Sequence, residues 1–131
     1  MIDLSSKIAR NIVILKMKIY HNPRCSKSRA ALQYLVDSGL NFEIVEYLKT
    51  NLTAAEVKDL LIKLAIPARA LLRSSEAVFK EHNLASLNYS EEQLISYMVK
   101  YPQLIERPII VKDNEACIAR PLENLERLIN D

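Results

Sequence analysis

Apolar residues recur along the chain with two different spacings, and each spacing predicts a different kind of element. In Met17–Tyr20 apolar and polar residues alternate, as in a strand with one buried face. From 28 to 38 the apolar positions have helical spacing, and Gly39 follows where a helix C-terminus is expected. Phe42–Leu48 combines apolar and β-branched residues and predicts a second strand. A strand, a helix and a strand within about thirty residues form a βαβ unit, so these two strands should be parallel.

The middle of the chain predicts helices, because two capping-box sequences each precede a run of apolar residues at helical spacing. Thr53–Glu56 opens the first of these runs, which Pro67 interrupts. Ser90–Gln93 opens the second, which stops at Tyr101 and the proline after it. Between the two, residues 68–72 predict a short helical turn.

The C-terminal part predicts a hairpin and a last helix. Residues 108–111 and 116–119 are strand candidates, and the polar residues 112–115 between them are typical of a hairpin turn, so these strands should be antiparallel. Pro121 then opens an amphipathic helix. A βαβ half followed by a ββα half is the thioredoxin arrangement. We therefore expect an α/β, thioredoxin-like fold with a mixed four-stranded sheet, and a helical insertion at about 50–105 between the halves.

The composition of the chain limits the classes of molecule that it is expected to bind. The chain has 131 residues, of which 50% are apolar and 26% charged, as in an ordinary globular domain. Its net charge of +2 is too small to indicate nucleic-acid or membrane binding, and no apolar run approaches the roughly 20 residues of a membrane helix. We expect a single domain over 17–131. Residues 1–16 are interpreted as an extension from an upstream start or an expression remnant, although Ile12–Leu15 is an alternative beginning for the first strand.

The cysteines and histidines are too few for a disulfide framework or a zinc site. Cys25 and Cys117 are the only cysteines and do not form a CxxC motif, which favours a reducing compartment and predicts a cytoplasmic protein. His21 and His82 are the only histidines, so no metal site is expected. We interpret Cys117 as structural and His82 as a surface residue.

Residues 21–29 join the first strand to the first helix and carry the candidate chemistry. Cys25 should lie at the helix N-terminus, where free N–H groups, the helix dipole and nearby basic residues stabilise a thiolate. The same N–H groups suit a small anion. Ser28 stands where thioredoxins carry a second cysteine, so an adduct of Cys25 must be resolved by an external thiol.

Four segments of the sequence together resemble the glutaredoxin-dependent arsenate reductase family. They are residues 19–29, 69–73, 107–111 and 119–121, with the sequences IYHNPRCSKSR, RALLR, RPIIV and ARP. The resemblance runs in order from about Met17 to the C-terminus.

The resemblance implies a role for each matched position. Cys25 would be the nucleophile, with His21 and Ser28 supporting its thiolate, and Pro108 would be the cis-proline opposite it. The oxyanion would be bound by the three arginines of the matched segments, Arg73, Arg107 and Arg120. Planar guanidinium groups that remain charged suit a tetrahedral oxyanion.

The implied activity is the reduction of As(V) to As(III), with arsenate as substrate, glutathione as co-substrate, glutaredoxin as protein partner and no bound cofactor. Two alternatives stay open. One is an Spx-like regulator that binds RNA polymerase through the same fold. The other is a thiol oxidoreductase of this fold that does not act on arsenate.

Overall fold

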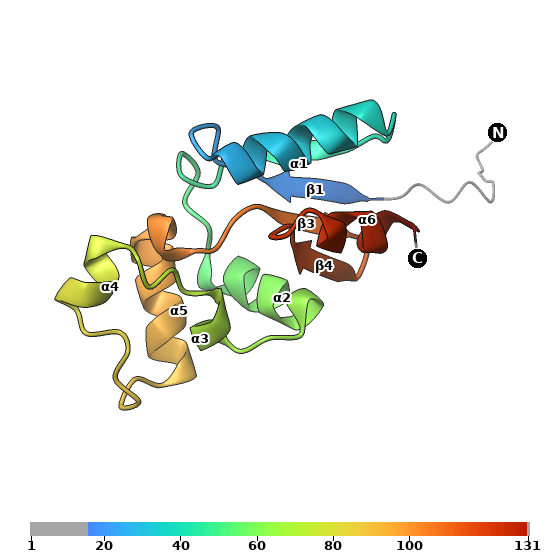
Figure 1. Cartoon of the computed structure of the whole chain (residues 1–131). Helices are drawn as coiled ribbons and strands as arrows, with labels where there is room; N and C mark the ends of the chain where they lie inside the picture. The colour runs from blue at the N-terminus through green and yellow to red at the C-terminus, as the bar shows by residue number, and fades with distance from the viewer. Residues whose placement is uncertain (1–15, 131) are drawn as a thin grey trace.

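A mixed four-stranded sheet in the order β2-β1-β3-β4 forms the centre of the protein. The computed structural model describes residues 16–130, and Figure 1 shows how the elements are arranged. The strands are β1 (Met17–Tyr20), β2 (Glu43–Val45), β3 (Ile109–Lys112) and β4 (Glu115–Ile118). β1 pairs in parallel with β2 and antiparallel with β3, which pairs antiparallel with β4. This topology confirms the predicted thioredoxin-like βαβ and ββα halves.

Helices cover both faces of the sheet (Figure 1). One face carries α1 (Ser26–Asp37) and α6 (Glu123–Asn130). The predicted insertion between the halves consists of α2 (Ala54–Leu64), α3 (Ala68–Leu71), α4 (Ala77–Glu81), α5 (Glu91–Lys100) and the 3-10 helix η1 (Pro102–Leu104). Within it, α2 packs against β4 on the opposite face of the sheet, and α5 packs against α2 and α3.

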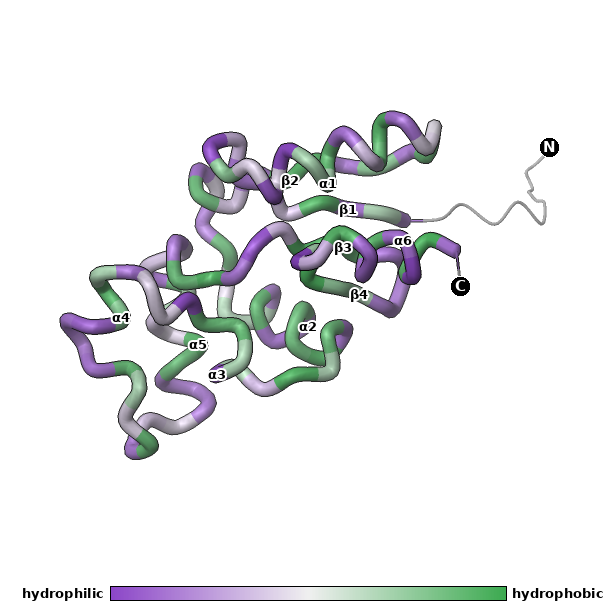
Figure 2. Tube along the Cα trace, viewed as in Figure 1, coloured by the Kyte–Doolittle hydropathy of each residue, from purple (hydrophilic) through white to green (hydrophobic). Residues whose placement is uncertain are grey.

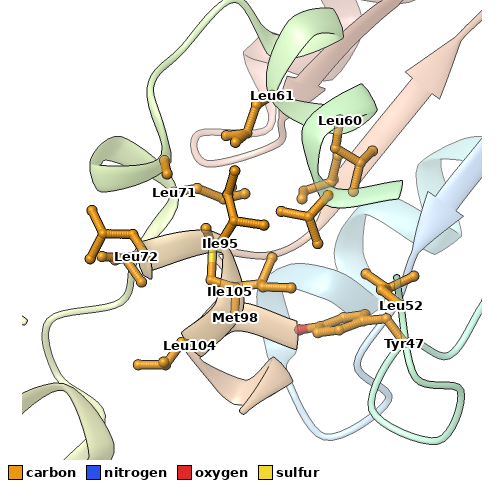
Figure 3. Close-up of a cluster of buried hydrophobic side chains, with 14 of the residues drawn as sticks. Tyr47, Leu52, Leu60, Leu61, Leu71, Leu72, Ile95, Met98, Leu104 and Ile105 are labelled. Carbon is orange, nitrogen blue, oxygen red and sulfur yellow. The ribbon is translucent and has the colours of Figure 1, made fainter. Parts of the chain in front are cut away.

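The strands bury side chains on both faces, which is why the core has two parts. Ile109 and Val111 of β3 face the insertion helices, whereas Ile110 faces α1 and α6. This strand is one of the hydrophobic stretches of the chain in Figure 2. The larger part of the core lies under the insertion, and Figure 3 shows Tyr47 beside Leu52 in it. The insertion and one face of the sheet therefore share the larger part of the core.

The helix termini follow the sequence signals. Thr53 and Ser90 each accept a backbone N–H at 3.1 Å from the residue three positions later, and both capping boxes are complete. Gly39 has φ +71°, the left-handed conformation that glycine adopts without steric cost after a helix. Local sequence signals thus decide where α1, α2 and α5 begin or end.

Some predictions about the elements were wrong. The second strand spans only Glu43–Val45 rather than 42–48, because the chain turns at Glu46, whose carbonyl accepts the N–H of Lys49 at 2.9 Å. α4 and η1 were not predicted. His82 is not a plain surface residue, since its ring lies 5.1 Å from that of Tyr97. The predictions for 1–15 lie outside the described residues.

No helix within residues 16–130 has both the length and the apolar character needed to span a membrane.

Candidate active site

The loop between β1 and α1 presents Cys25 at the helix N-terminus. Cys25 is the N-cap residue of α1, with extended backbone angles, and its N–H donates to the carbonyl of Asn22 at 3.0 Å. The Asn22 side chain, which is buried, accepts the N–H of Arg24 at 3.0 Å. These bonds form a tight turn that leaves the sulfur facing the first N–H groups of the helix.

The environment of Cys25 stabilises its thiolate. Partial burial alone would raise the pKa of Cys25, but hydrogen bonds from the N–H groups of Ser28 and Lys27 and from the Arg107 side chain outweigh this effect. The pKa of Cys25 is therefore lowered from its ordinary value. Of the three arginines in the matched segments, Arg107 is the one that lowers the pKa of Cys25.

His21 and Ser28 form a buried pair behind this loop. The Nδ1 of His21 lies 2.6 Å from the Ser28 hydroxyl oxygen, which also accepts the N–H of Asn22 at 3.0 Å. Burial lowers the pKa of His21; the negative charge of Glu46 opposes this effect and the positive charge of Arg29 adds to it, and the net direction is downward. The ring is therefore neutral near pH 7, and the Ser28 hydroxyl can donate to it. The hydrogen bond from Ser28 to the thiolate thus comes from its backbone N–H, and His21 acts on the loop through Ser28.

Three separate segments of the chain bring the arginines together. An isolated antiparallel bridge pairs Leu72 with Ile105, and the N–H of Arg73 donates to the carbonyl of Leu104 at 2.8 Å. Arg73 is thereby placed beside the segment that leads into Arg107. The β3–β4 hairpin brings Arg120 to the same point, where its Nη1 lies 3.4 Å from the carbonyl oxygen of Arg107.

The peptide bond between Arg107 and Pro108 is cis, as the family resemblance implies. Pro108 is buried, and its carbonyl accepts the N–H of Ala119 at 3.0 Å. The bond between Arg120 and Pro121 is also cis, which was not predicted.

Two glutamates link the three guanidinium groups. The Arg73 side chain contacts both carboxylates, with Nε 3.4 Å from Glu76 and Nη1 3.0 Å from Glu106. Glu76 also lies 3.9 Å from Nη1 of Arg107, and Glu106 lies 3.9 Å from Nη1 of Arg120. Neither glutamate was predicted from the sequence. The only signal was proximity in the sequence, since Glu106 precedes Arg107 and Glu76 follows Arg73 by three positions.

Two buried polar atoms beside this cluster have no hydrogen-bond partner among the described residues, the Tyr47 hydroxyl and Nε of Arg107. Burial raises the pKa of Tyr47 to about 12. The charges of Arg107 and Arg73 act in the opposite direction, whereas the charge of Cys25 adds to the increase. Tyr47 therefore stays protonated as a potential donor. A buried donor without a partner is costly, and such groups in native proteins call for a ligand or water to satisfy them.

Arg69, in the matched segment 69–73, and Cys117 have structural surroundings. Arg69 donates to the carbonyls of Leu84 and Ser86 at 2.8 and 2.9 Å and so anchors the loop after α4. Burial raises the pKa of Cys117 to about 11, which keeps it a neutral thiol. Within residues 16–130, no group of three or more His, Cys, Asp and Glu side chains could hold a metal ion.

Comparison with known proteins gives relatives over nearly the whole described chain. The model of the ArsC family matches residues 20–128. An Escherichia coli (strain K12) protein described as "Uncharacterized protein YfgD" is 48% identical over 115 residues, which are 87% of this chain and 97% of that protein. An arsenate reductase of Neisseria meningitidis serogroup A is 41% identical, over 87% of this chain and 98% of its own length.

A solved structure named as arsenate reductase from Vibrio cholerae has the same fold. It superimposes with a TM-score of 0.84 at 37% sequence identity, covering 88% of this chain and 98% of its own.

Proposed function

The chain belongs to the ArsC family, and from that premise we propose that it reduces arsenate to arsenite through Cys25, with glutathione and glutaredoxin as reductants. Relatives named as arsenate reductases match it over most of their length. Since the reaction consumes reduced thiols, a reducing compartment such as the cytoplasm suits it.

One observation carries the proposal. Cys25 lies at the N-terminus of α1, where the N–H groups of Lys27 and Ser28 and the Arg107 side chain lower its pKa, so the nucleophilic form of the sulfur is favoured. Through Glu76 and Glu106, Arg107 adjoins Arg73 and Arg120. A thiolate next to several guanidinium groups suits an attack on a tetrahedral oxyanion, because the same positive charges would bind the anion and stabilise the charge that develops.

In the proposed cycle, the Cys25 thiolate attacks arsenic and forms an S–As bond while one arsenate oxygen, once protonated, leaves as water. A glutathione thiol then displaces a second oxygen and forms a mixed adduct on arsenic. The thiol of glutaredoxin attacks the glutathione sulfur, and the electron pair of the As–S bond stays on arsenic, so As(V) becomes As(III) and glutathione and glutaredoxin form a mixed disulfide. Water then cleaves the bond between Cys25 and As(III), which releases arsenite and returns Cys25 to the thiolate. Ser28 in the loop cannot form a disulfide with Cys25, which agrees with resolution by an external thiol.

Coupled oxidation of NADPH tests the proposal, with arsenate, glutathione, glutaredoxin and glutathione reductase present. We expect arsenate-dependent turnover from the wild type and from Cys117→Ser, and none above background from Cys25→Ser. If the wild type gives no more turnover than Cys25→Ser, arsenate reduction is wrong. Reduction of a small disulfide through Cys25 in that case would favour the thiol oxidoreductase alternative.

A further inference from the structure

Both sides of the Arg73 guanidinium group are already occupied in the structure. Its Nε faces Glu76 at 3.4 Å and its Nη1 faces Glu106 at 3.0 Å. A carboxylate and a tetrahedral oxyanion use the same donors of a guanidinium group, since each places oxygen atoms against its N–H bonds. An oxyanion that binds two adjacent nitrogens of Arg73 therefore needs a donor that Glu76 or Glu106 holds, because each such pair includes Nε or Nη1.

The glutamates also reduce the positive charge of the cluster. Arg73, Arg107 and Arg120 contribute three positive charges, and Glu76 and Glu106 lie within 4 Å of them with two negative charges. These five side chains leave one net positive charge, which the Cys25 thiolate beside Arg107 offsets. Because charges at these distances interact strongly in partly buried surroundings, each carboxylate opposes the binding of a second anion.

The ion pairs are close to solvent, so a carboxylate can leave them. The Glu106 and Arg120 side chains are 31% and 34% exposed, compared with 15% for Arg73. Glu106 and Arg120 also line an open pocket of about 480 Å³, together with Asn124. Glu106 can therefore turn toward water without disturbing the core, and its pair with Arg120, at 3.9 Å, is longer than a hydrogen bond.

We propose that Glu76 and Glu106 are built-in competitors of the oxyanion, which displaces them from Arg73 when it binds, so that the two carboxylates set the anion affinity of the pocket. This proposal rests on the proposed function, because it takes the arginine cluster as the anion site. It gives the glutamates a specificity-determining role rather than a purely structural one. The two roles predict opposite changes in anion affinity when a glutamate is removed. A competitor weakens anion binding, whereas a scaffold that holds the arginines in place strengthens it.

Glutamine substitutions separate these roles, because glutamine keeps the shape of glutamate and one carbonyl oxygen but removes the charge. The readout is the concentration of inorganic phosphate that halves the rate of Cys25 alkylation by iodoacetamide. Phosphate is tetrahedral, and comparing rates with and without it within each variant cancels any change in the intrinsic reactivity of Cys25. Glu115→Gln, at the start of β4, is the matched control for net charge. Urea unfolding of each variant checks that it is folded.

We expect Glu106→Gln and Glu76→Gln each to lower the half-protecting phosphate concentration about tenfold, as removal of a charge close to the anion should, and Glu115→Gln to leave it unchanged. Half-protecting concentrations that rise in both variants, or that match the control, would overturn the competitor role. Since phosphate is not reduced, this result is independent of arsenate turnover. Absence of phosphate protection in the wild type and in every variant would overturn the anion pocket and this proposal together.

Discussion

The reactivity of Cys25 depends on three hydrogen-bond donors, of which only the Arg107 side chain can be removed by substitution. The folded-state pKa of Cys25 is lowered, so the thiolate persists below the pH at which an ordinary cysteine is protonated, and it is lost as pH falls through that lowered pKa. Arg107→Gln removes a charged donor and should move the thiolate titration to higher pH.

Thiolate absorbance in the ultraviolet, recorded against pH and corrected with Cys25→Ser, measures this change. Arg127→Gln is the control, because Arg127 lies near Cys117 and acts on the pKa of that residue. If Arg107→Gln titrates at the same pH as the wild type, Arg107 does not stabilise the thiolate.

Arg69 and Arg73 belong to one short sequence segment but have different partners. Arg69 binds two backbone carbonyls, whereas Arg73 binds the carboxylates of Glu76 and Glu106. Arg69→Gln should lower the free energy of unfolding by about 2 kcal/mol and leave arsenate turnover unchanged. Arg73→Gln should lower kcat/KM for arsenate about 100-fold, since an anion-binding donor is lost. Urea unfolding and steady-state kinetics on both variants check this, and equal kinetic losses would contradict it.

The residues of the site differ in how far the sequence could reveal them. Cys25 was placed at a helix N-terminus because its position depends on local turn and helix signals. Glu106 could not be identified in the same way, because its contact with Arg73 spans 33 positions and depends on the bridge between Leu72 and Ile105. Tyr47 was assigned to a predicted strand, and only the folded chain shows its hydroxyl buried beside charged groups.

At the scale of elements, helix starts were the features that the sequence predicted most closely. α2 begins after Thr53 with a complete capping box, in which Thr53 accepts the N–H of Glu56 at 3.1 Å and Glu56 accepts the N–H of Thr53 at 2.8 Å. Strand ends were harder to predict, because β2 stops where the chain turns at Glu46 and apolar residues continue beyond it. Tyr47 is buried in the core under the insertion without strand pairing, whereas Leu48 is 40% exposed.

Thr53→Ala removes the capping hydroxyl of α2 and should destabilise the protein by about 1 kcal/mol. Thr53→Ser keeps the hydroxyl and should remain close to the wild type. Chemical unfolding followed by circular dichroism compares the two. Equal stability of Thr53→Ala and Thr53→Ser would show that the capping box contributes nothing.

At the scale of the whole molecule, the insertion and one face of the sheet share the larger part of the core, so they should unfold together. Met98 of α5 is completely buried in the cluster that contains Ile109 of β3. Met98→Ala should cost about 2–4 kcal/mol through lost burial and a residual cavity. Ile62→Ala, at a side chain that is 76% exposed, should have little effect.

Two probes check this cooperativity. Urea transitions measured by circular dichroism and by alkylation of Cys117, which packs on the opposite side of the sheet, should coincide in the wild type and in Met98→Ala. A separate transition at lower urea concentration, detected by circular dichroism but not by alkylation of Cys117, would show that the insertion unfolds independently.

We propose that the fold places an ionised Cys25 beside Arg107 and the guanidinium groups next to it. Alkylation of Cys25 by iodoacetamide against pH, with and without arsenate, is the decisive test. We predict modification at Cys25 and not at Cys117, with an apparent pKa below that of an ordinary thiol and a rate that arsenate lowers. A Cys25 that titrates like a free thiol and reacts equally fast in the presence of arsenate would contradict the account.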